Sequence, residues 1–121
     1  MPYSTDSPVD YKALYDEEYY KSRGMKFLFE TPYDRKHADQ FVEKLRRAVP
    51  LGPQTRVLDL AFGIGYRPYF MSPLVAHIDA VDISPFAVEF AKKTYAQPNV
   101  VYHESDILAW TTDAKYDLVL L

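Results

Sequence analysis

The segment 56–66, with the sequence RVLDLAFGIGY, combines residue types that suit a ligand site. A short apolar run contains an acid, Asp59, and leads into a loop that includes Gly63 and Gly65. In an open α/β sheet, ligands bind at the carboxyl ends of the strands, where the strand order reverses. Small residues in such a loop let the backbone approach a ligand, and the helix that follows presents N–H groups. The segment therefore predicts a binding loop between a strand and a helix.

The second half of the chain supplies the elements that this loop needs. Strand-like apolar runs cover residues 56–61, 78–82, 100–102 and 116–121. Helical patterns separate the first three runs: a short one over 66–74, and a longer one that Ser84 caps and Pro85 opens. Strands that alternate with helices indicate parallel βαβ units, and strands apolar on both faces suit a sheet covered by helices on both sides. The fold class is therefore predicted to be α/β.

Two helical patterns come before the first strand. The pattern over 10–22 has its apolar and aromatic residues on one side, at steps of three or four: Tyr11, Leu14, Tyr15 and Tyr19. The pattern over 31–49 opens with the capping sequence TPYD, Thr31 to Asp34, and carries an apolar stripe. Prolines and a glycine break it at 50–53. We therefore divide the chain into a helical segment, 1–53, and a sheet-forming segment, 54–121.

Composition excludes several classes of function. The net charge of −3 over 121 residues argues against nucleic acid as the main partner, because phosphate binding needs a clustered basic face. No cysteine is present and the three histidines lie far apart, so a metal site has no support. The start MPYSTDSPVD lacks the features of a signal peptide, and no apolar run reaches the length of a membrane span. The expected setting is the cytoplasm, with no membrane partner.

The spacing of small residues in the loop discriminates between ligands. The dinucleotide fingerprint needs G-x-G-x-x-G, but Pro68 stands where the third glycine belongs. This weakens the alternative that the protein is an NAD enzyme. The spacing G-x-G-x-G fits instead, with Ala61, Gly63 and Gly65 in its three slots. Here VLDLAFGIG resembles the first motif of the class I S-adenosylmethionine-dependent methyltransferases, which is usually close to VLDLACGTG.

Three more segments resemble the same family, in the same order: IDAVDISPFAVEFAKK, NVVYHESDILAW and KYDLVLL. The resemblance covers residues 56–121 and implies a Rossmann-like parallel sheet in the order 3-2-1-4, without the later strands of the family fold. It also implies S-adenosylmethionine as the cofactor. Asp82 would accept hydrogen bonds from both ribose hydroxyls, which suits a carboxylate facing a vicinal diol. Asp106 would accept from the adenine amino group, and Ile83 and Ile107 would pack on the ring.

The remaining predicted cofactor contacts also follow from this resemblance. Asp59 would orient the loop or reach the methionine end through water, and Phe62 could narrow the pocket. The front end, YDEEYYKSRGMKF, resembles the N-terminal segment of small-molecule N-methyltransferases, which folds over the cofactor; Tyr15 and Tyr20 are its candidates. The complete predicted set is Tyr15, Tyr20, Asp59, Ala61, Phe62, Gly63, Gly65, Asp82, Ile83, Asp106 and Ile107. Arg67, in contrast, is interpreted as a solvated residue of the first helical turn.

The resemblance implies methyl transfer to a small-molecule acceptor, and no residue is assigned as a catalytic base. Because the run 116–121 would form an apolar sheet edge, we expect a truncated form, a homo-oligomer or a second chain that completes the sheet beside it. Phe62 and Ile64 are unusual in the loop, so a non-catalytic subunit that serves assembly stays an alternative. Another nucleotide-binding α/β protein is the third hypothesis.

Overall fold

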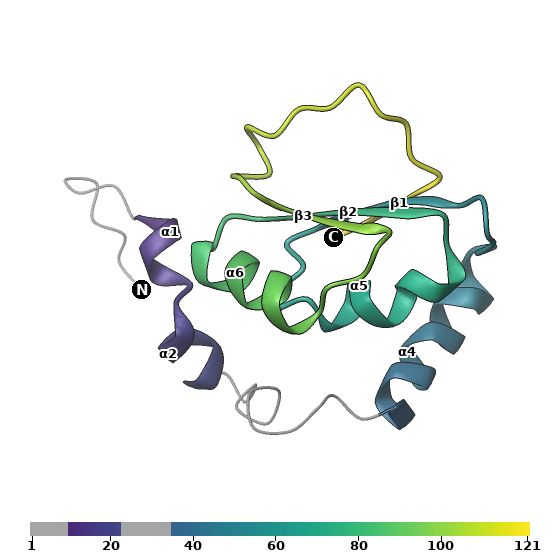
Figure 1. Cartoon of the computed structure of the whole chain (residues 1–121), viewed down its shortest axis with the longest axis horizontal. Helices are drawn as coiled ribbons and strands as arrows, with labels where there is room; N and C mark the ends of the chain where they lie inside the picture. Colours follow the sequence, from purple (N-terminus) through teal and green to yellow (C-terminus); the bar gives the residue numbers. More distant parts are fainter. Residues whose placement is uncertain (1–9, 23–34) are drawn as a thin grey trace.

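The computed structural model of the chain describes residues 10–22 and 35–121 (Figure 1). The predicted capping residues Thr31 to Asp34 lie outside these residues. In chain order the described elements are the helices α1 (Tyr11–Leu14), α2 (Glu17–Tyr20) and α4 (Arg35–Ala48), strand β1 (Arg56–Leu60), helix α5 (Tyr66–Met71), the 3₁₀ turn η2 (Ser72–Leu74), strand β2 (His77–Asp82), helix α6 (Pro85–Thr94), and strands β3 (Val100–Glu104) and β4 (Leu118–Leu120).

The four strands form one parallel sheet in the order β3-β2-β1-β4, which confirms the predicted order 3-2-1-4. Val57 of β1 aligns with Ile78 of β2, and Ile78 aligns with Val100 of β3. At the opposite edge Val57 aligns with Leu118 of β4. The order reverses between β1 and β4, so the crevice expected of an open α/β sheet lies at the carboxyl end of β1.

One face of the sheet carries the main core. Val57, Ile78 and Val100 have exposed fractions of 8% or less, and α5 and α6 pack on this face through Met71 and Ala91. Figure 1 shows these helices on one side of the sheet and the segment 105–117 arching over the other side. Among the described residues, therefore, helices cover one face only, and the prediction of helices on both faces was wrong for this part of the chain. The second face of β2 is polar where it carries His77 and Asp79.

The helix predicted over 10–22 is broken in the middle, so that prediction was also wrong. Asp10 caps α1, since its carboxylate accepts from the N–H groups of Lys12 and Ala13. Asp16 then caps α2, because its Oδ1 accepts from the Tyr19 N–H at 2.9 Å. Aspartate favours caps over helix interiors for this reason. The rings of Tyr11, Tyr15 and Tyr19 still contact one another in sequence across the break, and Tyr20 packs against Phe86 of α6.

The loop after β1 depends on backbone conformations that favour glycine. Ala61, Gly63 and Gly65 have φ values of 57°, 72° and 102°. A Cβ on Gly65 would lie 2.6 Å from the Cβ of Ala91 on α6, whereas a Cβ on Gly63 would meet no atom within 4 Å. Glycine is therefore favoured at position 65 for two reasons, the left-handed backbone and the close approach of α6. At position 63 only the left-handed backbone favours it.

The two glycines provide a matched test of this close approach. We expect Gly65→Ala to lower the free energy of unfolding by about 3 kcal/mol, from left-handed strain plus overpacking. We expect Gly63→Ala to lower it by about 1 kcal/mol, from strain alone. Urea denaturation of both variants measures the difference. Equal losses would show that contact with Ala91 does not restrict position 65.

Candidate functional site

A cavity of about 570 Å³ lies at the carboxyl ends of the first three strands. Ala61 and Gly63 follow β1, Asp82 and Ile83 end β2, and Asp106 follows β3, so each strand contributes one part of the wall. Among the described residues, the lining is Tyr11, Tyr15, Tyr19, Tyr20, Ala61, Gly63, Asp82, Ile83, Asp106, Ile107 and Leu108. Its volume falls within the range of pockets that enclose a small-molecule ligand.

Asp82 is the most constrained polar group of the cavity. Its side chain is almost fully buried, Oδ2 accepts from the Gly63 N–H at 3.0 Å, and Oδ1 accepts from the Ser84 N–H at 2.9 Å. Burial raises the pKa of Asp82, and these backbone donors offset only part of the effect. A carboxylate has about four acceptor positions, more than the backbone donors use, so it can still accept from a hydroxyl group of a ligand. The carboxylate therefore joins two loops and still faces the cavity.

The residues after β3 form the opposite wall. Asp106 is exposed, and its Oδ1 accepts from the Leu108 N–H at 2.9 Å. The Asp106 carbonyl accepts from the N–H groups of Ala109 and Trp110, which closes a compact turn. Ile83 and Ile107 line the cavity from the loops that follow β2 and β3. The two isoleucines suit the faces of a flat ring, and the Asp106 carboxylate suits a hydrogen-bond donor on its edge.

A group of tyrosines from α1 and α2 completes the wall. Tyr20 is buried in a cluster with Ile64 and Ala87, and its ring lies 6.1 Å from that of Phe86. Burial and the charge of Asp82 raise the pKa of Tyr20, so its hydroxyl is neutral. Tyr15 is held differently, because its carbonyl accepts a hydrogen bond from the Ser84 hydroxyl. The front helices are thus tied to the start of α6.

Ser84 connects these parts of the site. Its N–H donates to Asp82, its hydroxyl donates to the Tyr15 carbonyl, and the same oxygen accepts from the Ala87 N–H at 3.0 Å as the cap of α6. The sequence predicted Ser84 only as a helix cap. Tyr11, Tyr19 and Leu108 also line the cavity and were not predicted. The helical spacing of Tyr11 and Tyr19 with Tyr15 was the signal available for two of them.

Three members of the predicted set lie elsewhere. Gly65 is buried against α6. Phe62 is 4% exposed and packs in the core, with its ring 5.1 Å from that of Tyr102. Its side chain therefore points away from the cavity and does not narrow it. Ile64 is fully buried beneath Tyr20. The two unusual residues of the loop thus pack inside the protein, and their side chains do not enter the cavity.

Asp59, the third, is fully buried and forms an ion pair with Arg67 of α5. Arg67 Nε donates to Asp59 Oδ2 at 3.0 Å, and Nη2 donates to Oδ1. Burial would lower the pKa of Arg67, but the bonds and charge of Asp59 raise it, so the guanidinium remains charged. The interpretation of Arg67 as a solvated residue was wrong. A buried acid near the end of β1 needed a cation, and the first turn of α5 supplies it.

The described residues 10–22 and 35–121 contain no group of three side chains that could hold a metal ion. Over the same ranges, no helix has the length and apolar character that a membrane span requires.

Comparison with known proteins identifies a family whose matched residues include the loops around the cavity. A family model described as a methyltransferase domain matches residues 57–121, more than half of the chain. The chain belongs to this methyltransferase-domain family. The matched range includes β1, the loop after it and the three later strands, and seven of the eleven described lining residues of the cavity fall within it. No curated protein sequence matches the chain significantly.

Several solved structures share the fold. The complex of DhpI with S-adenosylhomocysteine (SAH) is 26% identical, with a TM-score of 0.61, over 93% of this chain and 53% of DhpI. CalS10 from Micromonospora echinaspora, an amino pentose methyltransferase with bound S-adenosylmethionine, is 18% identical, with a TM-score of 0.57, over 93% of this chain and 42% of CalS10. NodS from Bradyrhizobium japonicum, an N-methyltransferase, is 19% identical, with a TM-score of 0.56, over 74% of this chain and 44% of NodS. The chain thus spans about half of each of these proteins or less.

The Asp59–Arg67 pair predicts an asymmetric response to mutation. Arg67→Met leaves a buried carboxylate without its partner, and we expect a loss of about 3 kcal/mol in the free energy of unfolding. Arg47→Met is the matched control, since Arg47 pairs with Glu43 on an exposed surface and its loss costs about 0.5 kcal/mol or less. Urea denaturation at neutral pH measures both. A small loss for Arg67→Met would contradict the structural role of the pair.

Proposed function

We propose that this chain holds the cofactor site of a methyltransferase that transfers a methyl group from S-adenosylmethionine to a small-molecule acceptor. The observation that carries the proposal is the position of Asp82. Its buried carboxylate lies at the end of β2, beside the Ala61–Gly63 backbone and opposite Ile107, in a cavity of about 570 Å³. The family match and the SAH-bound relative DhpI support the same cofactor.

The proposed contacts follow the chemistry of each wall. Asp82 accepts from the ribose hydroxyls at the acceptor positions that its backbone donors leave open. Ile83 and Ile107 cover the adenine ring, and Asp106 accepts from its amino group. Ala61 and Gly63 allow the backbone to approach the ligand, while Asp59 acts through Arg67 and the loop. Tyr15 and Tyr20 enclose the remaining side.

The residues of the cavity act by alignment and exclusion of water. S-adenosylmethionine, when bound, supplies an electrophilic methyl group on a sulfonium that leaves as a neutral thioether. Asp82 and Asp106 would hold the cofactor by hydrogen bonds. The chemistry that it would supply is transfer of the methyl group to the acceptor as the carbon–sulfur bond breaks, and an amine acceptor's proton would be released to water once the methylated product has left the site. Tyrosines on the open side hold the acceptor and exclude bulk water. A neutral amine needs no base for this step, and none is assigned.

The edge of the sheet supports a proposal about assembly. β4 has no neighbour on its outer side among the described residues, and Val119 on it is 55% exposed. Exposed apolar edge strands tend to pair with another strand. We propose that a further strand, from a continuation of this chain, a second copy or another chain, lies beside β4 and completes the sheet, and that the protein acts in the cytoplasm.

Binding of SAH tests the proposed cofactor site. We expect the 121-residue chain to bind it one to one with a dissociation constant (Kd) of about 10 μM. Asp82→Asn should raise the Kd by about thirtyfold, because it removes charged acceptors for the ribose hydroxyls. Asp113→Asn, at an exposed position away from the cavity, is the control. Isothermal titration measures all three, and unchanged affinity in a folded Asp82→Asn variant would contradict the proposal.

The raised pKa of Asp82 predicts a pH dependence of this binding. Hydroxyl donors favour the ionised carboxylate, whereas burial favours the protonated one. We therefore expect affinity for SAH to fall as the pH is lowered from about 7 to about 4, and to fall much less in Asp82→Asn. Titrations of both proteins across this range, with far-UV circular dichroism as a check on folding, measure the effect. The same decline in both would assign it to another group.

A further inference from the structure

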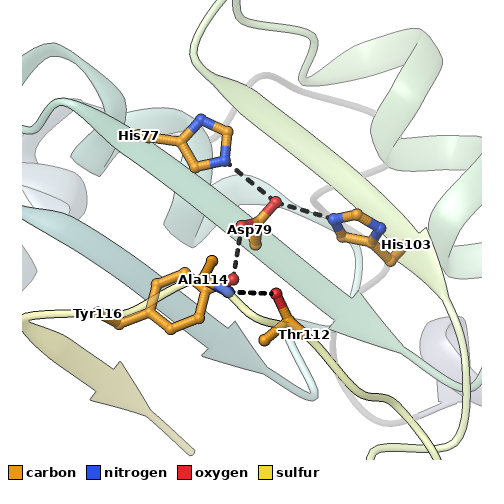
Figure 2. A network of polar contacts seen from close by, with 6 residues as sticks. All are labelled: His77, Asp79, His103, Thr112, Ala114 and Tyr116. Atoms are coloured by element: carbon orange, nitrogen blue, oxygen red, sulfur yellow. Dashed lines mark hydrogen bonds and ion pairs between the residues drawn. The ribbon is translucent and has the colours of Figure 1, made fainter.

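A polar cluster on the second face of the sheet has no part in the cavity. Asp79 of β2 is 9% exposed, although its neighbours in the strand are apolar. Its Oδ1 accepts from Nε2 of His77 at 3.1 Å and from Nε2 of His103 at 2.9 Å, and its Oδ2 accepts from the Tyr116 hydroxyl at 2.6 Å (Figure 2). Three donors from β2, β3 and the segment before β4 thus converge on one carboxylate.

The carboxylate is ionised in this setting. Burial alone would raise the pKa of Asp79, but the hydrogen bonds from Tyr116, His103 and His77 together lower it below its usual value. A charged acceptor strengthens each of these bonds. The hydrogen bonds of Asp79 therefore connect β2, β3 and Tyr116.

Two of the three donors lead to the segment 105–117, which carries one wall of the cavity. The His103 ring packs against Trp110, with ring centroids 5.6 Å apart, and the Trp110 N–H donates to the Asp106 carbonyl at 2.9 Å. Tyr116 belongs to the far end of the same segment, next to Asp117, whose carboxylate accepts from the Arg56 N–H at 2.8 Å. His77, at the start of β2, donates to the same carboxylate, but none of its described contacts is with the segment 105–117.

The middle of this segment is open to solvent. Its residues 111–115 are all exposed, and they have neither helix nor strand structure. At its start the Ser105 N–H donates to the Asp82 carbonyl at 2.9 Å. Between this anchor and Asp117, the Trp110 ring contacts His103 of β3 and the Tyr116 hydroxyl donates to Asp79 of β2. Asp106, Ile107 and Leu108 thus lie between the Ser105 anchor and Trp110, which contacts His103 of the cluster.

We infer that Asp79 is a positioning residue for the cofactor site and acts through His103 and Tyr116 to hold the wall formed by Asp106, Ile107 and Leu108. Asp79 lies on the face of the sheet that α5 and α6 do not cover, and it does not line the cavity. The inference rests on the proposed function, since the wall that it concerns is that of the proposed cofactor site.

The two histidines allow a matched test. Both donate to the same oxygen of Asp79, and their side chains have similar exposure, 25% for His77 and 31% for His103. His103→Ala breaks the path to Trp110, so we expect the Kd for SAH to rise about fivefold. His77→Ala removes an equivalent bond without that path, so the Kd should stay within about twofold of the wild-type value. Tyr116→Phe keeps the ring, loses the hydroxyl, and should behave like His103→Ala.

A second measurement needs no cofactor. Amide hydrogen exchange at Leu108, Ala109 and Trp110 should be faster in His103→Ala than in the wild type, and unchanged in His77→Ala. Trp110 is the only tryptophan of the chain, so its emission also reports the contact with His103. A melting temperature for each variant separates a local change from general loss of stability.

The outcomes distinguish this inference from the proposed function. Absence of SAH binding by the wild type would contradict the proposed function, and the exchange experiment would still decide the inference. If the wild type binds SAH, and His103→Ala keeps the Kd and the exchange rates of the wild type, the inference is overturned. Equal effects from both variants would also overturn it, because they would show that only the stability of the sheet matters.

Discussion

The Asp82 carboxylate is the constraint on which the site depends. It accepts one hydrogen bond from the loop after β1, through Gly63, and one from the start of α6, through Ser84. These two loops come from adjacent strands, and a single buried group sets the distance between them. Because Asp82 also lines the cavity, the group that fixes the loops is the group that a ligand meets. Burial between the two loops raises the pKa of Asp82.

The left-handed turn after β1 makes this arrangement sterically possible. Gly65 brings the chain to within contact distance of Ala91, so that α5 and α6 pack closely on one face of the sheet. The ion pair between Asp59 of β1 and Arg67 of α5 joins the two elements on either side of this turn. Ser84 extends the arrangement to the front helices, since it holds Tyr15 in addition to Asp82. Loop, helices and tyrosine wall thus form one connected structure around the cavity.

Local patterns in the sequence predicted the elements that are defined by neighbouring residues. Alternation of apolar runs with helical patterns gave the four parallel strands, and Ser84 with Pro85 gave the start of α6. The sheet order and the residues that end each strand came from the resemblance to methyltransferases. The division at residue 53 and the contacts of individual residues with a cofactor stay predictions.

The features that sequence reasoning missed depend on contacts between distant residues. Arg67 lies eight residues from Asp59, and Tyr116 lies 37 residues from Asp79. The side of the loop on which Phe62 packs depends on the position of Tyr102. One signal was available: Asp79 interrupts an apolar strand, and a buried acid requires donors. The break between α1 and α2 could also have been predicted, because Asp16 is a better cap than an interior helical residue.

The most direct test of the account is a crystal structure of the chain with SAH. The account predicts both ribose hydroxyls within hydrogen-bond distance of the Asp82 carboxylate, and the adenine ring between Ile83 and Ile107. A ligand bound at another site, or one whose ribose does not approach Asp82 in this cavity, would contradict it.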